Sequence, residues 1–285
     1  MTIAISLKIN DGIVLAADSA TTLVQNGPQG PIAVNVYNNA NKIFNLRKGL
    51  PVGVVTWGVG SIGEASTATL LKDFRARLTD GSEGWKLAPN DYSIRQVADK
   101  LRQFIYDEHY RPRFNASTGN PEIGFVVAGY SSNAANAEEF RIDIQQNGEC
   151  SGPSSVRLQG ECGIAWSGQP EALNRLILGV STKVPMLLKS ELQLDDERLR
   201  SLMQAMVPKL QAPLISPAMP LQDAIDLAEF LAEVAVQWSR FMPGAQSVGG
   251  PVEVAAISKH EGFRWIKRKY YFTRDLNPSE GGERI

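Results

Sequence analysis

The first eighteen residues constrain the fold more than any other stretch of this sequence. Between Thr2 and Ile9, isoleucine and leucine alternate with smaller or polar residues, which is the pattern of a β-strand. Turn-forming residues follow at 10–12, and a second apolar run at 13–17 ends on Asp18. The two runs predict a β-hairpin. With Ile9 opposite Ile13, Asp18 becomes a diagonal neighbour of Thr2, about 7–8 Å away.

Thr2 is of chemical interest because only Met1 precedes it, and a residue this small permits removal of the initiator methionine. A free N-terminal threonine carries a hydroxyl nucleophile and an α-amine on one residue. The amine, with an ordinary pKa of about 7.7–8.0, is a general base at neutral pH. The alternative is that Met-Thr is a common start and that threonine simply favours strands.

The remaining periodicity separates strands from helices along the chain. A polar segment at 19–41 with two Gly-Pro pairs indicates a loop. Strands are predicted at 42–46, 52–57, 122–130, 140–144, 162–166, 252–258 and 263–271, and helices at 67–78 (with Ser61 as N-cap), at 91–108, from 170, around 197–210 and at 221–241. Because strands and helices occur in runs and do not alternate, we expect an α+β fold with antiparallel sheets. We expect a single domain over 1–285, with an insertion or contact segment at 180–220 and a polar tail at 274–285.

Composition excludes several classes of function. The chain has 285 residues, 43% of them hydrophobic, and a formal net charge of −1 with acids and bases interspersed, so we expect neither a nucleic-acid nor a membrane partner. Cys150 and Cys162 have no metal-site or redox-motif spacing, which indicates a cytoplasmic protein without disulfides. His109 and His260 are the only histidines, so we expect no metal and no cofactor.

Residues 58–63 read G-V-G-S-I-G, a match to the dinucleotide-binding motif between a predicted strand and a predicted helix. That motif also requires a second parallel strand about twenty residues later that ends in an acidic residue. Residues 79–84 contain no apolar run there. A glycine turn at a helix N-terminus can instead present backbone N–H groups to an anion or a developing oxyanion.

Several short motifs occur in an order that resembles the β-subunits of proteasomes, which are N-terminal-nucleophile hydrolases. They are Thr2 on the first strand, D-G-I-V-L-A-A-D-S at 11–19, N-K-I-F at 41–44, W-G-V-G at 57–60, W-S-G at 166–168 and G-G-P-V-E-V-A-A-I at 249–257. The resemblance implies a four-layer αββα sandwich of two antiparallel sheets. It also implies assembly into homo-oligomeric stacked rings that hydrolyse unfolded polypeptides, with an ATP-dependent unfoldase as a further partner.

The resemblance also assigns site residues by matching position. Thr2 resembles the catalytic threonine, Asp18 and Lys42 its acid and lysine, Gly58 the oxyanion-hole residue, and Ser167 the serine that hydrogen-bonds the terminal amine. A lysine ammonium beside the threonine would favour loss of the hydroxyl proton. The first specificity pocket would be lined by Thr21, Ala40, Phe44 and Thr56, with Phe44 narrowing it toward small or medium apolar side chains.

The sequence departs from the family pattern before the Gly-Gly pair. The family has an aspartate and a serine there, and the matching positions are Ala245 and Val248, with Gln246 and Ser247 as the nearby polar residues. Three functions therefore stay open. They are a threonine peptidase acting through an acyl-enzyme, a ring subunit that serves as inactive scaffold or gate, and an N-terminal-nucleophile amidase acting on a small amide. Each assigned side chain also has an ordinary structural use: Asp18 can cap a turn, Lys42 can be a solvated edge lysine and Ser167 can cap a helix.

Overall fold

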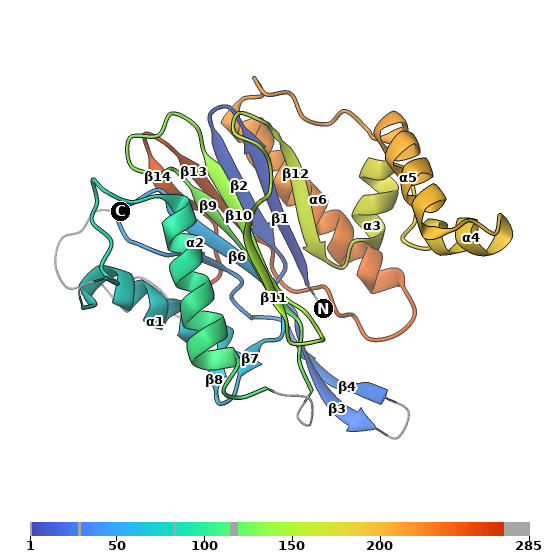
Figure 1. Cartoon of the computed structure of the whole chain (residues 1–285), viewed down its shortest axis with the longest axis horizontal. Helices are drawn as coiled ribbons and strands as arrows, with labels where there is room; N and C mark the ends of the chain where they lie inside the picture. The colour runs from blue at the N-terminus through green and yellow to red at the C-terminus, as the bar shows by residue number, and fades with distance from the viewer. Residues whose placement is uncertain (1, 28–29, 83, 115–118, 271–285) are drawn as a thin grey trace.

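The structure is a computed structural model that describes residues 2–27, 30–82, 84–114 and 119–270. Its framework is two five-stranded antiparallel sheets (Figure 1). The first sheet has the order β12 (Gly163–Gly168), β1 (Ile3–Ile9), β2 (Gly12–Ala17), β13 (Glu253–Ser258) and β14 (Gly262–Lys267). The second has the order β11 (Cys150–Ser155), β10 (Glu138–Ile144), β9 (Ile123–Gly129), β6 (Val52–Gly58) and β5 (Ile43–Asn45). The predicted antiparallel sheets are confirmed.

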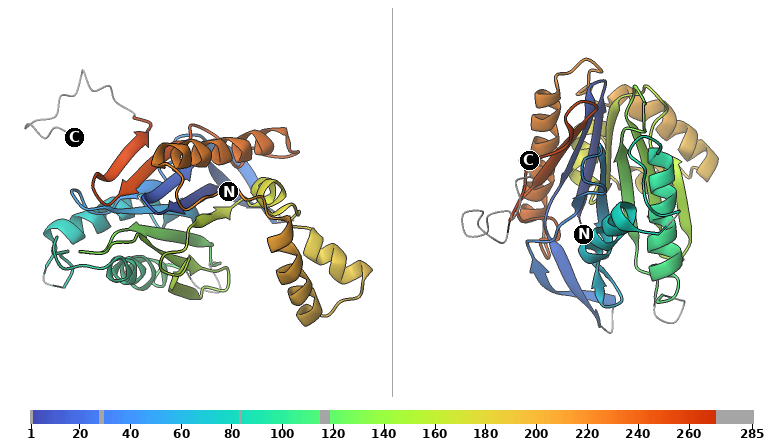
Figure 2. Two further views of the ribbon diagram at one scale, coloured as in Figure 1. Left: turned by 90° about the horizontal axis from the view of Figure 1, so that it is seen from above. Right: turned by 90° about the vertical axis from the view of Figure 1, so that its left-hand side faces the viewer.

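Helices cover the outer faces of the two sheets. Figure 2 shows α6 on one side of the paired sheets and α1 and α2 on the other. The helices are α1 (Thr67–Asp80), α2 (Ile94–Arg102) continuing into the π-helix η1 (Gln103–Tyr110), α3 (Glu171–Leu173) continuing into the π-helix η2 (Asn174–Leu178), α4 (Val184–Glu191), α5 (Asp196–Leu210) and α6 (Leu221–Phe241). The segregation of strands and helices follows from the sequence periodicity.

Buried apolar side chains form three clusters that match this arrangement. One lies between the sheets and includes Ile13 and Val126. A second joins β1 and β2 to α6 through residues such as Leu7 and Leu231. The third joins the second sheet to α1 and α2, with Phe74 in its centre. Among the described residues, none of the helices is long and apolar enough to cross a membrane.

The N-terminal hairpin forms as predicted, but its register differs by one residue. Ile9 pairs with Gly12 and not with Ile13, because the turn uses only the two residues between them. Asp18 therefore lies beside Ile3 and not opposite Ala4, and its backbone N–H donates to the Ile3 carbonyl at 3.3 Å.

The prediction of a loop at 19–41 is wrong. Strands β3 (Thr21–Gly27) and β4 (Gly30–Tyr37) form a two-stranded antiparallel ribbon that projects from the sheets (Figure 1). Two strands without a sheet to bury them can be polar and can hold proline at an edge, so the Gly-Pro pairs were misleading. The N-cap prediction for α1 is also wrong: a short hairpin, β7 (Ser61–Ile62) and β8 (Ala65–Ser66), precedes the helix, and Ser66, not Ser61, is its N-cap.

The segment at 180–220 contains α4 and α5, which lie at the side of the molecule away from α1 and α2 (Figure 1). Neither helix has a buried residue. Several of their large apolar side chains are exposed, namely Met186, Leu187, Leu192, Leu202 and Leu210. The predicted polar tail at 274–285 lies outside the described residues.

Candidate active site

Asp18 is the centre of the candidate site and has no solvent exposure. One carboxylate oxygen, Oδ1, accepts from the Ile3 N–H at 3.0 Å and from the Lys42 ammonium at 2.6 Å. The other, Oδ2, accepts from the N–H groups of Ala20 at 3.0 Å and Gly249 at 2.9 Å. With four donors on two oxygens, this buried carboxylate is fully satisfied and holds three chain segments together.

Lys42 lies just before β5 and is 6% exposed. Its backbone carbonyl accepts from the Thr56 N–H at 2.9 Å, which fixes the segment against β6. Burial lowers the pKa of the Lys42 ammonium below its ordinary 10.5, and the charge of Asp18 and the hydrogen bond to it oppose that shift. Among the described residues Lys42 has Asp18 as its one ion-pair partner, which leaves its other N–H donors available to a ligand.

A cavity of about 640 Å³ opens beside these residues. Thr2, Lys42 and Gly58 line it together, as do three of the four residues predicted for the specificity pocket, Thr21, Ala40 and Thr56. Thr2 is 3% exposed. Residues that are far apart in the sequence, from Thr2 to Gly58, thus line one cavity. Its size is typical for small-ligand or peptide side-chain sites.

Phe44 is the exception among the predicted pocket residues. It does not line the cavity with Thr2. Its ring packs in the cluster between the second sheet and α1 and α2. The physical reason is depth: Phe44 pairs with Val54 inside the sheet, two residues further from the sheet end than Lys42. The structure therefore does not place Phe44 in the cavity that Thr2 lines.

Gly58 ends β6 at the cavity wall with φ +96°, a conformation that favours glycine. A Cβ at this position would lie 2.2 Å from the Glu122 carbonyl oxygen, so no other residue fits without moving β9. The glycine motif at 58–63 serves this turn and the approach to α1, because the Gly60 carbonyl accepts from the Thr67 N–H at 2.9 Å. The next strand beside β6 is antiparallel, which is not the dinucleotide-binding arrangement.

Ser167 lies on β12, one residue along from the pairing partner of Ile3. The following residue, Gly168, has φ +95°, and a Cβ there would lie 1.9 Å from the Thr2 carbonyl oxygen. The Gln169 N–H donates to that same oxygen at 2.7 Å. The end of β12 and the residue after it therefore lie directly against the Thr2 backbone.

Arg141 was not predicted as a site residue. Its guanidinium donates to the Ser167 hydroxyl oxygen at 2.8 Å and stacks over the Trp57 ring, 4.7 Å from its centroid. Asp143 holds it through two hydrogen bonds of 2.6 and 2.9 Å. No local sequence pattern predicts this contact, because Arg141 is in the second sheet and Ser167 in the first. Since Ser167 accepts from Arg141, its hydroxyl hydrogen is free to point toward another acceptor.

The positions that depart from the family pattern do not supply acidic groups to the site. Ala245 is exposed, and Val248 is buried in the cluster between the first sheet and α6. Ser247 is buried between them and accepts from the Gln169 side-chain amide at 3.3 Å. It thus connects this segment to Gln169, whose backbone N–H bonds the Thr2 carbonyl.

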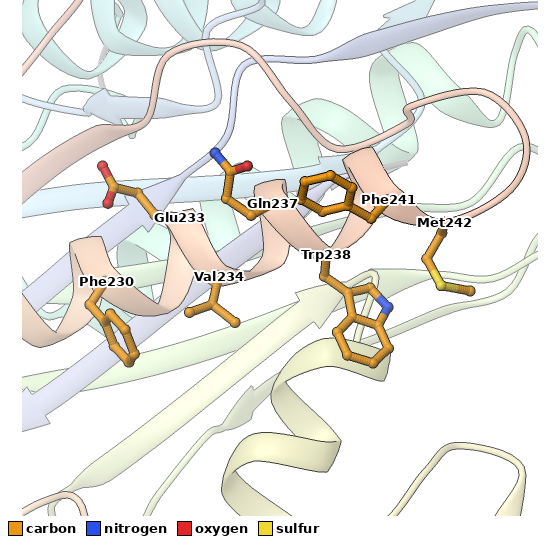
Figure 3. Close-up of a pocket in the computed structure, with 7 residues that line it drawn as sticks. All are labelled: Phe230, Glu233, Val234, Gln237, Trp238, Phe241 and Met242. Atoms are coloured by element: carbon orange, nitrogen blue, oxygen red, sulfur yellow. The ribbon is translucent and has the colours of Figure 1, made fainter.

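A different cavity, of about 540 Å³, lies along α6 and its C-terminal end (Figure 3). Its lining is mainly apolar, from Phe230, Val234, Trp238, Phe241 and Met242, with Glu233 and Gln237. It contains no nucleophile beside a base, so it offers no chemistry. In the part of the chain that the structure describes, no group of three or more His, Cys, Asp or Glu side chains is placed to hold a metal ion.

No protein-family model and no curated protein matches this chain. Among solved structures it is similar to Anbu (ancestral beta-subunit) from Yersinia bercovieri, with 12% identity and a TM-score of 0.47 over 94% of this chain and 88% of the other. It is also similar to a Gly-1 mutant of Anbu from Hyphomicrobium sp. strain MC1, with 14% identity and a TM-score of 0.48 over 94% and 86% of the two chains. Likeness at this level transfers no function to this chain.

These comparisons correct one prediction. The sequence motifs were interpreted as those of the proteasome β-subunit family. That assignment is wrong, since no family model matches and the similar structures are Anbu proteins, which form a distinct family. Short motifs around a glycine, a lysine and an aspartate are shared too widely to separate one family from its relatives.

Proposed function

We propose that this chain is an N-terminal-nucleophile hydrolase, in which Thr2, freed by removal of Met1, cleaves peptide bonds. The observation that supports this most is the buried Lys42–Asp18 pair, whose lysine lines the same cavity as Thr2. In this proposal, the two sheets and their outer helices form the four-layer αββα sandwich of that class. The whole of 1–285 is one domain, in which 180–220 is a contact segment.

The proposed reaction uses both groups of Thr2. Its hydroxyl oxygen attacks the peptide carbonyl carbon, and the α-amine takes the hydroxyl proton. The carbonyl oxygen becomes negative and accepts from the Gly58 N–H at the cavity wall. The C–N bond then breaks, the leaving amine takes the proton from the α-ammonium, and an ester on Thr2 remains. Water hydrolyses this ester, with the α-amine again accepting the proton.

The neighbours of Thr2 have distinct roles in the proposal. Lys42 stabilises negative charge on the threonine oxygen and disfavours a second positive charge on the amine. Asp18 positions Lys42 and is not itself a proton carrier, because all its oxygens are occupied by donors. Ser167, polarised by the Arg141 guanidinium, orients the terminal amine. The side chains of Thr21, Ala40 and Thr56 contact the substrate.

We extend the proposal to the assembly and its substrates. Exposed apolar side chains on α4 and α5, such as Met186 and Leu192, support contacts with neighbouring copies in a homo-oligomeric ring. A ring that encloses the sites would act on unfolded polypeptides, delivered by an ATP-dependent unfoldase.

A second candidate, a ring subunit without chemistry, is favoured by one observation. Neither exposed Ala245 nor buried Val248 can support the terminal amine by a charge or a hydrogen bond from its side chain. In that case the Asp18–Lys42 pair would have only a structural use.

Intact-mass measurement and a peptidase assay test the proposal together. We expect the purified chain to lack Met1, to gain one β-lactone adduct and to hydrolyse a fluorogenic peptide. Thr2→Ala, which also permits Met1 removal, is the matched control and should lose adduct and hydrolysis. Thr2→Ser should retain both. A retained Met1 would exclude the proposed mechanism, and a processed chain without adduct or hydrolysis would favour the scaffold.

A further inference from the structure

A separate cavity of about 450 Å³ lies where α1, β5 and the end of β14 meet. Lys72 and Arg75 line it from α1, Asn45 from β5, and Trp265 and Arg268 from β14 and the residues after it. Thr2 does not line it, so it is distinct from the candidate active site. No step of the proposed reaction uses its side chains.

The cavity carries an excess of positive charge. Four cations line it, Lys72, Arg75, Arg268 and Lys269, against one carboxylate, Glu253. Glu253 is already paired with Lys269 at 2.9 Å. Within the described residues, no carboxylate forms an ion pair with the other three cations. Burial and, to a lesser extent, repulsion from Arg268 lower the pKa of Arg75.

The cavity also holds a buried acceptor without a donor. Asn45 lines the cavity, but its Oδ1 has neither a hydrogen-bond partner nor contact with solvent, so a ligand reaches this atom only when the side-chain amide rotates toward the cavity. An unpaired buried acceptor is unfavourable, so a group that donates an N–H or O–H would complete a site of this kind. Asn45 thus requires a hydrogen-bond donor from the ligand, whereas the arginines require a hydrogen-bond acceptor.

Guanidinium groups bind phosphate through paired N–H donors and do so better than lysine ammonium groups. The Arg268 guanidinium is fixed by the rings of Trp265 and Tyr270, 4.5 and 5.2 Å from their centroids. A volume of about 450 Å³ exceeds what inorganic phosphate fills and is within the range of small-molecule sites. A ligand of this cavity must therefore carry an anionic group and hydrogen-bond donors, together with a larger organic part, its body, that fills the remaining volume.

We propose that this cavity binds a phosphorylated small molecule, with its phosphate between Arg75 and Arg268 and a hydroxyl or N–H of its body donating to Asn45. Sugar phosphates and nucleoside monophosphates share this chemistry. The proposal is independent of the proposed hydrolase function, because binding is measured without turnover.

Titration calorimetry of the full chain tests it, with ribose 5-phosphate, adenosine monophosphate, inorganic phosphate and citrate as probes. We expect saturable binding of at least one organic phosphate, about ten-fold or more tighter than of inorganic phosphate or citrate. Arg75→Gln and Arg268→Gln should each weaken it about ten- to hundred-fold, since each removes charged hydrogen bonds. Arg264→Gln, on β14 but outside the cavity, is the control and should not change it.

Asn45→Ala tests the contact with the body of the ligand separately from the contacts with its phosphate. It should weaken the organic phosphate and leave inorganic phosphate unchanged, with thermal melting to confirm that the variant folds. The proposal is overturned if neither organic phosphate binds saturably, if citrate or inorganic phosphate binds equally well, or if Arg264→Gln and Arg268→Gln have equal effects.

Discussion

The two polar cavities share one wall and use charge in opposite ways. Asn39 and Asn41 line both, and the Ala40 carbonyl between them accepts from Lys269 at 2.8 Å. Each has a lysine–carboxylate pair, Lys42–Asp18 at 2.6 Å and Lys269–Glu253 at 2.9 Å. Both carboxylate oxygens of Asp18 accept hydrogen bonds from donors. In the second cavity, by contrast, Lys72, Arg75 and Arg268 have no carboxylate partner among the described residues.

This difference indicates what each cavity is suited to. A fully satisfied carboxylate fixes its lysine in place and makes a rigid arrangement for chemistry. Uncompensated cations beside an unpaired acceptor instead require a ligand to complete them. Four predictions test this distinction, beginning with the largest effect.

Lys42→Ala should slow β-lactone labelling of the protein about 10²- to 10⁴-fold, the range for loss of a group that assists proton transfer. Lys269→Ala, which removes the lysine of the other cavity, should change the rate less than about ten-fold, since Lys269 does not line the cavity with Thr2. The labelling rate is followed by intact mass. Equal effects of the two substitutions would remove the distinction between the cavities.

Asp18→Ala should lower the free energy of unfolding by about 3–5 kcal/mol, because it leaves the buried Lys42 ammonium unpaired. Glu253→Ala should cost less, about 1–3 kcal/mol, because Lys269 keeps its bonds to Ser19 Oγ and the Ala40 carbonyl. Urea unfolding of both variants gives the comparison. A larger loss for Glu253→Ala would show that the second pair is the more structural one.

Gly58→Ala should destabilise the protein by about 1–3 kcal/mol more than Gly49→Ala. Both glycines have positive φ, at +96° and +79°, but only at Gly58 would a Cβ meet the backbone of Glu122. The difference between the two variants therefore reports the close approach at the cavity wall. Denaturant midpoints at equal slope measure it, and indistinguishable midpoints would contradict it.

The labelling rate should also fall at alkaline pH. The pKa of Lys42 is lowered by burial, so its ammonium loses its proton as pH rises through a value below the ordinary 10.5. Because the charged lysine is the active form in the proposed mechanism, the decline begins at a lower pH than a free lysine would give. A rate that stays level up to pH 10.5 would show that the charge of Lys42 is not used.

Local patterns in the sequence predicted most of the framework. The alternation at 2–9 predicted β1, and the helical periodicity at 221–241 predicted α6. The isoleucine and leucine face of β1 packs against the apolar face of α6 in one cluster. The ribbon of β3 and β4 was missed because, among the described residues, these strands pair with each other and with neither large sheet, and apolar side chains such as Leu23 and Val34 are exposed. The predicted hairpin register was wrong by one residue, because alternation within the strands does not determine the length of the turn between them.

Within the site, the order of motifs placed Thr2, Lys42, Gly58, Thr21, Ala40 and Thr56 in one cavity. Phe44 lies outside this cavity, because sequence proximity to Lys42 does not determine depth in the sheet. Arg141 and the cationic cavity depend on contacts between distant segments, such as β10 with β12, and no local pattern reports those.

The central claim is that the liberated Thr2 is the nucleophile. Tandem mass spectrometry of the N-terminal peptide, after treatment of the intact protein with a β-lactone, tests it most directly. The account predicts a peptide that begins at Thr2 and carries a single adduct on that residue. A peptide that still begins at Met1, or an adduct on any other residue, would contradict it.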